Sequence, residues 1–296
     1  MKIIHSFWSK PSLKKNEYNA FDRSNGGWSD RKYNYMSWAL SCLQFKKYYK
    51  EVELVTDKFG YDILINHLNL PYTDVKVVLD DLNDYDPNLW ALGKIYAYSI
   101  QDKPFIHVDG DVYIWEQFRD EIKKSPLIAQ NLERDFIYYD EIYNELISNF
   151  EYFPSVLETS KRNNKGIVAI NAGIIGGNNI NFFKEFTEEA FRFVDKNLKH
   201  LNKVNIGVFN VIYEQFLFYA MAENKKSDIA YYSSSINQCF DGIADFTGVP
   251  EKVKYVHAIS GLKASNYIGD LMAFHLRRDH PDYYYKIINK LKEYKI

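Results

Sequence analysis

Short apolar runs alternate with helically spaced segments over the first 115 residues. Short runs rich in β-branched residues are typical of strands, whereas apolar positions at i, i+3 and i+4 are typical of amphipathic helices. The pattern predicts strands at residues 2–5, 52–56, 75–79 and 105–108. It predicts helices at residues 29–49, with Ser29 as the N-cap, 59–68 and 89–101. This alternation favours an α/β fold with a largely parallel sheet and crossover helices.

The pattern is less regular beyond residue 115. It predicts helices at residues 117–124, 182–198, 208–223 and from about 282, and strands at 127–129, 229–232 and 253–257. Residues 131–165 are mixed in pattern, which is typical of an insertion. Since no repeat or low-complexity linker marks a boundary, we predict a single domain, 1–296. Within it we expect two halves, 1–115 and 116–270, and a C-terminal helical segment, 271–296.

Composition narrows the classes of function. The chain has 37 basic and 39 acidic residues, so no overall field favours nucleic acid as a partner. Cys42 and Cys239 are too few for a disulfide framework, and we expect reduced core thiols. The N-terminus shows no leader-like apolar region, and no run approaches the ~18 apolar residues of a spanning helix. These features favour a cytoplasmic protein.

Two carboxylates, Asp109 and Asp111, stand one residue apart where the predicted strand at 105–108 ends. The carboxyl ends of strands are where open α/β sheets bind ligands. Hard divalent cations prefer oxygen ligands, so Asp109-Gly110-Asp111 predicts a metal site. The alternative is an Asp-Gly hairpin turn with two solvated carboxylates.

Three further segments follow in order: Asn171-Ala172-Gly173-Ile174-Ile175-Gly176-Gly177, then Tyr213-Glu214-Gln215-Phe216, then Val256-His257-Ala258-Ile259-Ser260-Gly261-Leu262-Lys263. With Asp109-Gly110-Asp111, this series resembles nucleotide-sugar glycosyltransferases of the GT-A fold, particularly the retaining group containing glycogenin and the bacterial lipopolysaccharide galactosyltransferases. That group carries Asp-x-Asp, Asn-x-Gly, an acidic or amide pair on a helix, and His-x-x-Gly-x-x-Lys. Here the glycine of the last motif stands one place late, and Ala264-Ser265 replace the usual Pro-Trp. The resemblance implies a Rossmann-like, mixed and mostly parallel sheet flanked by helices.

The resemblance also implies an activity, namely sugar transfer from a nucleotide-diphosphate donor, such as a UDP-sugar, to a saccharide or glycoconjugate acceptor. Asp109, Asp111 and His257 would hold Mn²⁺ or Mg²⁺, which neutralises charge on the departing diphosphate. Asp111 would thereby act in catalysis, and Gly261 and Lys263 would contact the diphosphate. The alternatives are an ordinary buried or surface histidine and a solvated lysine.

Other candidate donor contacts lie earlier in the chain. His5, Phe7 and Trp8 follow the first strand, where such folds place the nucleobase. Asp57 ends the second strand and resembles a base or ribose contact, and Lys94 matches a basic donor-binding position. The alternatives are core packing for the rings, helix capping for Asp57 and plain exposure for Lys94.

On the acceptor side, the Asn171 amide could bind a sugar hydroxyl, and Gly173 and Gly176 would permit close approach of the backbone. The alternative for Gly176-Gly177 is a hairpin turn. Glu214 lies on an otherwise apolar helix, so it either faces the cleft or pairs with a cation. In a retaining reaction Glu214 or Gln215 would stabilise the sugar, and in an inverting reaction Glu214 would be the general base.

Two other functions remain open from the sequence. A sugar nucleotidyltransferase usually has a glycine-rich basic loop after the first strand, and here Lys10, Lys14 and Lys15 precede Gly26-Gly27. A non-catalytic carbohydrate-binding or partner-binding module would leave the Asp-Asp-His set unexplained. The aromatic and basic C-terminus is a candidate for peripheral membrane contact, with a packed terminal helix as the alternative. The oligomeric state is left open.

Overall fold

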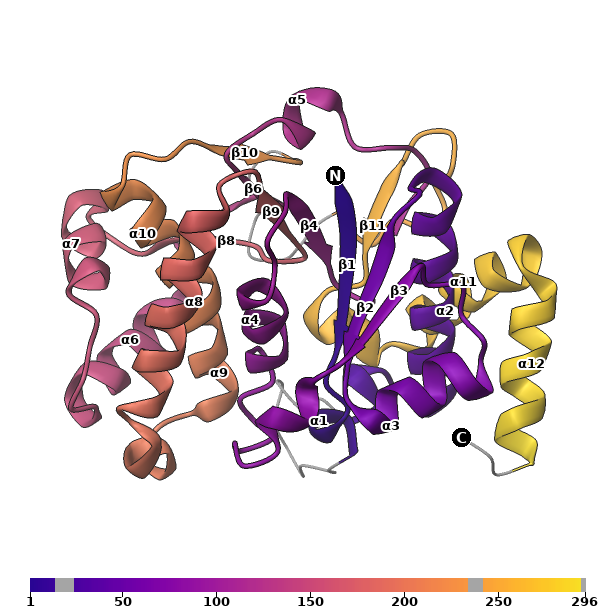
Figure 1. The fold of residues 1–296 in the computed structure, drawn as a ribbon, viewed down its shortest axis with the longest axis horizontal. Helices are drawn as coiled ribbons and strands as arrows, with labels where there is room; N and C mark the ends of the chain where they lie inside the picture. The colour runs from indigo at the N-terminus through magenta and orange to yellow at the C-terminus, as the bar shows by residue number, and fades with distance from the viewer. Residues whose placement is uncertain (14–23, 234–241, 294–296) are drawn as a thin grey trace. The chain divides into compact units, whose positions relative to one another are not determined.

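The protein has an α/β fold with a mixed, mostly parallel sheet flanked by helices, as predicted (Figure 1). The computed structural model describes residues 1–13, 24–233 and 242–293. Cys239, Lys14 and Lys15 lie outside the described residues. The chain divides into two compact units. The first unit comprises 2–87, 109–117 and 240–296, and the second unit comprises 88–108 and 118–239. The division into halves at residues 115 and 270 stays a prediction.

The first unit contains three parallel strands in the order β1 (Lys2–Phe7), β2 (Val52–Thr56) and β3 (Asp74–Val77). Helix α2 (Arg31–Tyr48) connects β1 to β2, and α3 (Lys58–Tyr61) continues into η2 (Asp62–His67) before β3. The strand predicted at 52–56 is confirmed to the residue. The N-cap of α2 is Asp30 and not Ser29, because the Asp30 carboxylate accepts the Lys32 amide at 2.8 Å.

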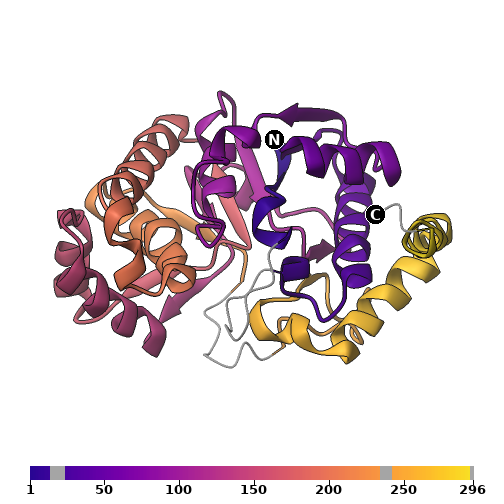
Figure 2. The same cartoon turned by 90° about the horizontal axis from the view of Figure 1, so that it is seen from below.

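The remaining elements of the first unit come from later in the chain. Strand β5 (Val112–Ile114) pairs antiparallel with β11 (Tyr255–His257). Helices α11 (Asn266–Asp279) and α12 (Pro281–Lys292) pack against α2 (Figure 2). Short helical turns complete the unit: α1 (Lys10–Leu13), η1 (Ser24–Gly27), η3 (Leu79–Leu82) and η6 (Ser260–Ala264).

The second unit has four strands in the order β4 (Phe105–Val108), β9 (Ile174–Gly177), β6 (Leu127–Ala129) and β10 (Ile229–Tyr231). Strand β9 is antiparallel to β4 and β6, while β10 is parallel to β6. A separate antiparallel pair joins β7 (Leu132–Arg134) to β8 (Val168–Ile170). The helices of this unit are α4 (Leu92–Ser99), α5 (Asp120–Lys123), α6 (Ile137–Asn149), α7 (Ser155–Asn164), α8 (Ile180–Asp195), η4 (Leu198–Lys203), α9 (Ile206–Val211), η5 (Ile212–Phe216) and α10 (Leu217–Asn224).

Gly176 and Gly177 lie inside β9, so the hairpin-turn interpretation is wrong. A Cβ on Gly176 would stand 2.2 Å from the carbonyl oxygen of Phe105 in the paired strand β4. Gly177 has φ of 145° and a Cβ there would stand 2.0 Å from the carbonyl oxygen of Pro126. Close packing of backbone on backbone therefore accounts for both glycines.

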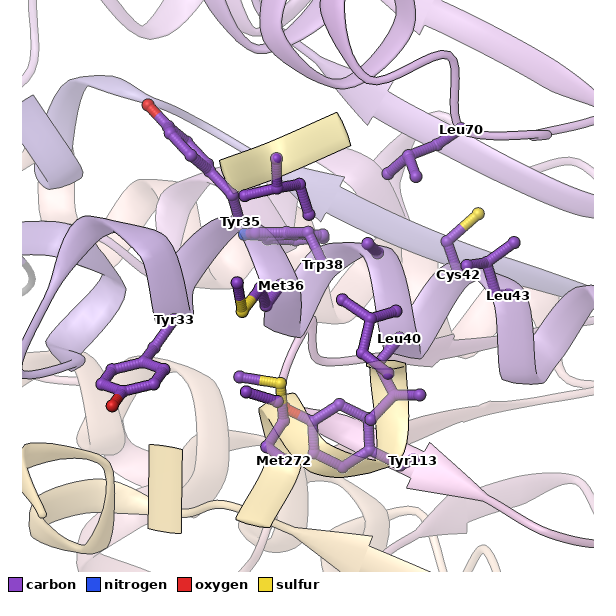
Figure 3. Packing of buried hydrophobic residues seen from close by; sticks show 14 of the residues in the cluster. Tyr33, Tyr35, Met36, Trp38, Leu40, Cys42, Leu43, Leu70, Tyr113 and Met272 are labelled. Atoms are coloured by element: carbon purple, nitrogen blue, oxygen red, sulfur yellow. The ribbon is translucent and has the colours of Figure 1, made fainter. Parts of the chain in front are cut away.

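A cluster of buried side chains forms the core of the first unit around α2 (Figure 3). Trp38 and Leu40 of α2 belong to it, together with Tyr113 of β5 and Met272 of α11. Cys42 is a buried free thiol, as predicted, and burial raises its pKa. Helix α2 is therefore the common surface on which β5 and α11 pack. Among the described residues, every helix is too short or too polar to cross a membrane.

Candidate metal centre

Asp109, Gly110 and Asp111 link β4 to β5. The turn is closed by a hydrogen bond of 3.0 Å from the Val112 amide to the Asp109 carbonyl oxygen. Strand β5 pairs with β11 and not with β4, and only 8% of the surface of Asp111 is exposed. The segment is therefore not a hairpin turn with solvated carboxylates. Instead it delivers one carboxylate into the interior of the first unit.

Helix α2 fixes this turn from one side. The Ser37 hydroxyl donates to the Gly110 carbonyl oxygen at 2.7 Å, and the Ser41 hydroxyl donates to that of Val112 at 2.7 Å. The two serines are four residues apart, so they share a face of the helix. The ring of Trp38 covers Gly110, where a Cβ would stand 2.7 Å from three ring atoms. The turn can rest on α2 only because its middle residue has no side chain.

Strand β11 brings His257 to the same place. His257 is in register with Val112, and the Ala258 amide donates to the Asp111 carbonyl oxygen at 3.0 Å. The His257 Nε2 atom lies 3.5 Å from Asp111 Oδ1. Potential ligand atoms of Asp109, Asp111 and His257 all lie within 4.8 Å of one another. The three residues predicted to bind a metal are therefore gathered by the fold.

Lys263 also reaches this group. It follows β11 on η6, and its Nζ atom donates to Asp111 Oδ2 at 2.6 Å. Its side chain is buried, so the solvated-lysine alternative is wrong. Gly261, two residues earlier, is exposed, and a Cβ there would meet nothing within 4 Å. The described residues thus give no steric reason for that glycine, and its role stays a prediction.

The charge of Asp111 is set by opposing effects. Burial raises its pKa, but the Lys263 ammonium and His257 together outweigh burial and hold the pKa well below its usual range. Asp111 is thus ionised at neutral pH. Its Oδ1 atom is buried and accepts no hydrogen bond from the described residues. The contact of this oxygen with His257 Nε2 at 3.5 Å is longer than an ordinary hydrogen bond, so a bound cation would compensate the buried charge further.

The donor set fits a divalent cation. Two carboxylates and one imidazole suit Mn²⁺, which accepts nitrogen as well as oxygen, and Mg²⁺ would be held chiefly by the carboxylates. The structure therefore contains a candidate metal centre formed by Asp109, Asp111 and His257.

The predicted base-binding residues lie in the core of the first unit. His5 is fully buried, with Nδ1 3.0 Å from the Tyr72 hydroxyl and Nε2 3.1 Å from the Ser41 hydroxyl. Burial lowers the pKa of His5 to about 3. Phe7 and Trp8 are also buried, and Phe7 packs on the Trp38 ring with centroids 4.9 Å apart. The core-packing alternative accounts for all three rings.

Asp57 caps a helix. Its carboxylate accepts the Gly60 amide of α3 at 2.7 Å, and it also accepts the Ser9 amide and hydroxyl at 2.7 and 2.6 Å. These three bonds occupy both oxygens of a buried carboxylate. The capping alternative therefore describes this residue, and we assign it no contact with a nucleotide.

Lys94 and Glu214 form a buried ion pair in the second unit. The Lys94 ammonium lies 2.7 Å from Glu214 Oε1, and it also donates to the Ala172 carbonyl oxygen at 3.2 Å. Glu214 has no exposed surface and also accepts the Tyr98 hydroxyl at 3.1 Å. Of the two alternatives for Glu214, pairing with a cation is the one observed. Plain exposure of Lys94 is wrong.

Asn171 and Gln215 belong to a second polar group in this unit. The Asn171 amide donates to Glu133 Oε1 at 2.7 Å, and its oxygen accepts the Gly173 amide at 3.0 Å. The Tyr139 hydroxyl lies 2.7 Å from Glu133 Oε2 and 2.6 Å from Gln215 Oε1. Asn171 is thus occupied by protein partners. A sugar-binding role for it stays a prediction.

Glu133 is absent from the sequence-based candidates. It is almost fully buried on β7, within a stretch whose mixed pattern gave no strand. Leu132 before it and the aromatic residues within 136–139 after it do not distinguish it from Asp135, although a buried acid needs several donors. Tyr138 and Tyr139 supply two of them, at 3.3 and 2.7 Å.

Comparison with known protein families gives one finding. The profile of a family described as "Family of unknown function (DUF6734)" matches residues 1–290. Among curated proteins, none matches the chain.

Proposed function

Because the chain belongs to a family of unknown function, DUF6734, we propose a function from its own residues. We propose a metal-dependent glycosyltransferase that moves a sugar from a nucleotide-diphosphate donor, with UDP as the nucleotide, to a saccharide or glycoconjugate acceptor. The observation that carries this proposal is the convergence of Asp109, Asp111 and His257 beside a buried Lys263.

The residues of the metal centre suit a diphosphate leaving group. A divalent cation at Asp109, Asp111 and His257 would supply Lewis-acid neutralisation of the diphosphate. Lys263 adds a buried positive charge on a long side chain at the same place. With its charge neutralised in this way, the diphosphate can leave without protonation by a general acid, which a poorer leaving group would need.

The surroundings of Glu214 in the second unit disfavour it as the general base of an inverting reaction. A general base must be free to take a proton from the acceptor, but Glu214 is fully buried and bound to the Lys94 ammonium. Gln215 is partly exposed and carries a neutral amide. We therefore assign Glu214 to holding Lys94 in place, and we keep the retaining form of the reaction as the proposal.

The proposal is tested by thermal unfolding with Mn²⁺ and each of UDP, GDP, CDP and ADP. A nucleotide at 100 times its Kd stabilises by roughly 2.7 kcal/mol, which raises Tm by several degrees. We expect such a shift for wild type and none for Asp109→Asn. Asp62→Asn, an exposed carboxylate of the same unit, is the matched control and should behave as wild type.

Either of two results would contradict the proposal. One is the absence of a shift with every nucleotide although Mn²⁺ itself binds, which favours a non-catalytic module. The other is release of pyrophosphate from a nucleoside triphosphate and a sugar phosphate, which identifies a nucleotidyltransferase.

A further inference from the structure

Asp111 serves two partners with its two oxygens. Oδ2 accepts the Lys263 ammonium at 2.6 Å, while Oδ1 faces His257 Nε2 at 3.5 Å. All three side chains are buried or nearly so. The pair of Asp111 and Lys263 is therefore an ion pair screened from water, in which the ammonium compensates the carboxylate charge.

The same carboxylate is a ligand of the candidate metal centre. A divalent cation bound to Asp109, Asp111 and His257 would lie on the carboxylate that the ammonium already touches. Positive charges a few ångströms apart repel strongly where water is excluded. The ammonium and the metal therefore compete for Asp111.

The side chain of Lys263 can change its conformation when a metal binds. Its ammonium is joined to the backbone of the short helical turn η6 by four methylene groups, which rotate readily. Asp111 and His257, in contrast, are fixed by the pairing of β5 with β11. The backbone of Lys263 is itself held, because its carbonyl oxygen accepts the Ser29 amide at 3.3 Å. A rotation of the side chain would thus move the Lys263 ammonium while the Lys263 backbone stays in place.

We propose that Lys263 is a built-in counter-cation, which holds Asp111 in the metal-free protein and leaves it when a divalent metal binds. The released ammonium then serves an anionic ligand of the phosphate class. This inference rests on the metal centre of the proposed function. According to this inference, Lys263 weakens metal binding, whereas a lysine that only binds anions would not.

The test is calorimetric titration of the whole chain with Mn²⁺ alone. The variants are Lys263→Met and Lys263→Gln, which remove the charge, and Lys263→Arg, which keeps it. Lys58→Met removes an exposed lysine of the same unit and is the matched control. Asp111→Asn identifies the binding event that belongs to this centre. Two neutral variants are used because loss of the ammonium leaves the Asp111 charge uncompensated, and circular dichroism shows which of them folds.

We expect either neutral variant to bind Mn²⁺ at least about tenfold more tightly than wild type. Lys263→Arg and Lys58→Met should bind as wild type does. The neutral variants should also lose thermal stability without metal and regain it with Mn²⁺, which a lysine that only touches anions would not cause.

If both neutral variants bind Mn²⁺ as tightly as wild type or more weakly, the proposal that Lys263 is a counter-cation is wrong. If Asp111→Asn nevertheless abolishes binding in that experiment, the metal centre itself stands. If wild type and Asp111→Asn bind Mn²⁺ with the same affinity, the assignment of the metal centre is wrong, and so is the counter-cation role of Lys263.

Discussion

The ring of Trp38 lies against Gly110, so that a Cβ on this glycine would stand 2.7 Å from three atoms of the indole. Trp38 is itself part of the buried core of the first unit (Figure 3). The middle residue of Asp109-Gly110-Asp111 is therefore fixed by packing on α2. The spacing of the Asp109 and Asp111 carboxylates therefore depends on the contact between Trp38 and Gly110.

Gly110→Ala should disturb the metal centre. Because the added methyl group cannot be absorbed by the indole, we expect a loss of about 1–3 kcal/mol in the free energy of unfolding and weaker Mn²⁺ binding. Urea unfolding and calorimetry measure the two effects. Gly261→Ala is the control, since open space surrounds that position, and it should change neither quantity. A Gly110→Ala protein with wild-type stability would show that the contact is not restrictive.

Ser37→Ala should loosen the same turn from the side of the helix. The hydroxyl of Ser37 donates to the Gly110 carbonyl oxygen and lies 2.7 Å from the hydroxyl of buried Tyr113. Loss of one partner from buried hydrogen bonds costs about 1–3 kcal/mol. We expect a decrease of this size in urea unfolding, with Ser148→Ala, whose hydroxyl is exposed, unchanged. Stability equal to that of wild type would mean that α2 does not hold the turn.

His5 should make the protein sensitive to acid. Its pKa is lowered by burial to about 3, against about 6.5 in the unfolded chain, so the unfolded state binds more protons between these values. The stability that depends on neutral His5 is complete above pH 6.5 and falls by up to about 1.4 kcal/mol per pH unit towards pH 3.

The measurement is urea unfolding of wild type and His5→Gln from pH 7 to pH 4. His5→Gln should start from lower stability and lose less of it in acid. His67→Gln changes a partly exposed histidine of the same unit and should keep the wild-type slope. Equal slopes for wild type and His5→Gln would refute the assignment of this pKa to the folded state.

The buried pair of Lys94 and Glu214 should be coupled in stability. Lys94→Met leaves a fully buried carboxylate uncompensated, which costs about 3–5 kcal/mol, whereas Lys94→Met with Glu214→Leu should lose less than the two single changes combined. Urea unfolding of all four proteins gives the coupling energy. Lys123→Met, which breaks an exposed pair with Asp120, should cost under about 1 kcal/mol. Strict additivity of the two buried changes would contradict a direct interaction.

Much of the fold follows from the sequence because the strands are short apolar runs with clear ends. Val52–Thr56 and Leu127–Ala129 are such runs, and the structure confirms both to the residue. Helix α11 is predicted only in its second half, within the helical segment at 271–296, because it exposes Tyr267 and Phe274 while burying Met272 and Leu276, which blurs its helical period. Its place follows from packing on α2, which a local pattern does not contain.

The candidate site was predictable only in part. Position at a strand end marks Asp109 and Asp111, which the fold gathers with His257, but it also marks His5 and Asp57, whose side chains turn into the core or cap a helix. Spacing along the chain does not state which way a side chain points. The gathering of His257 with Asp111 was expected only from the family resemblance, because β11 and β5 are far apart in sequence. Glu133 gives no distinct signal, because Arg134 and Asp135 stand directly after it.

The central claim is sugar transfer from a nucleotide donor, and release of UDP from a panel of UDP-sugars tests it most directly. The assay contains Mn²⁺ and compares wild type with Asp109→Asn and the control Asp62→Asn. With water as the acceptor, we predict UDP release from at least one donor by wild type and Asp62→Asn, and its abolition in Asp109→Asn. No release from any donor, by a folded protein that binds both Mn²⁺ and UDP, would contradict the assignment.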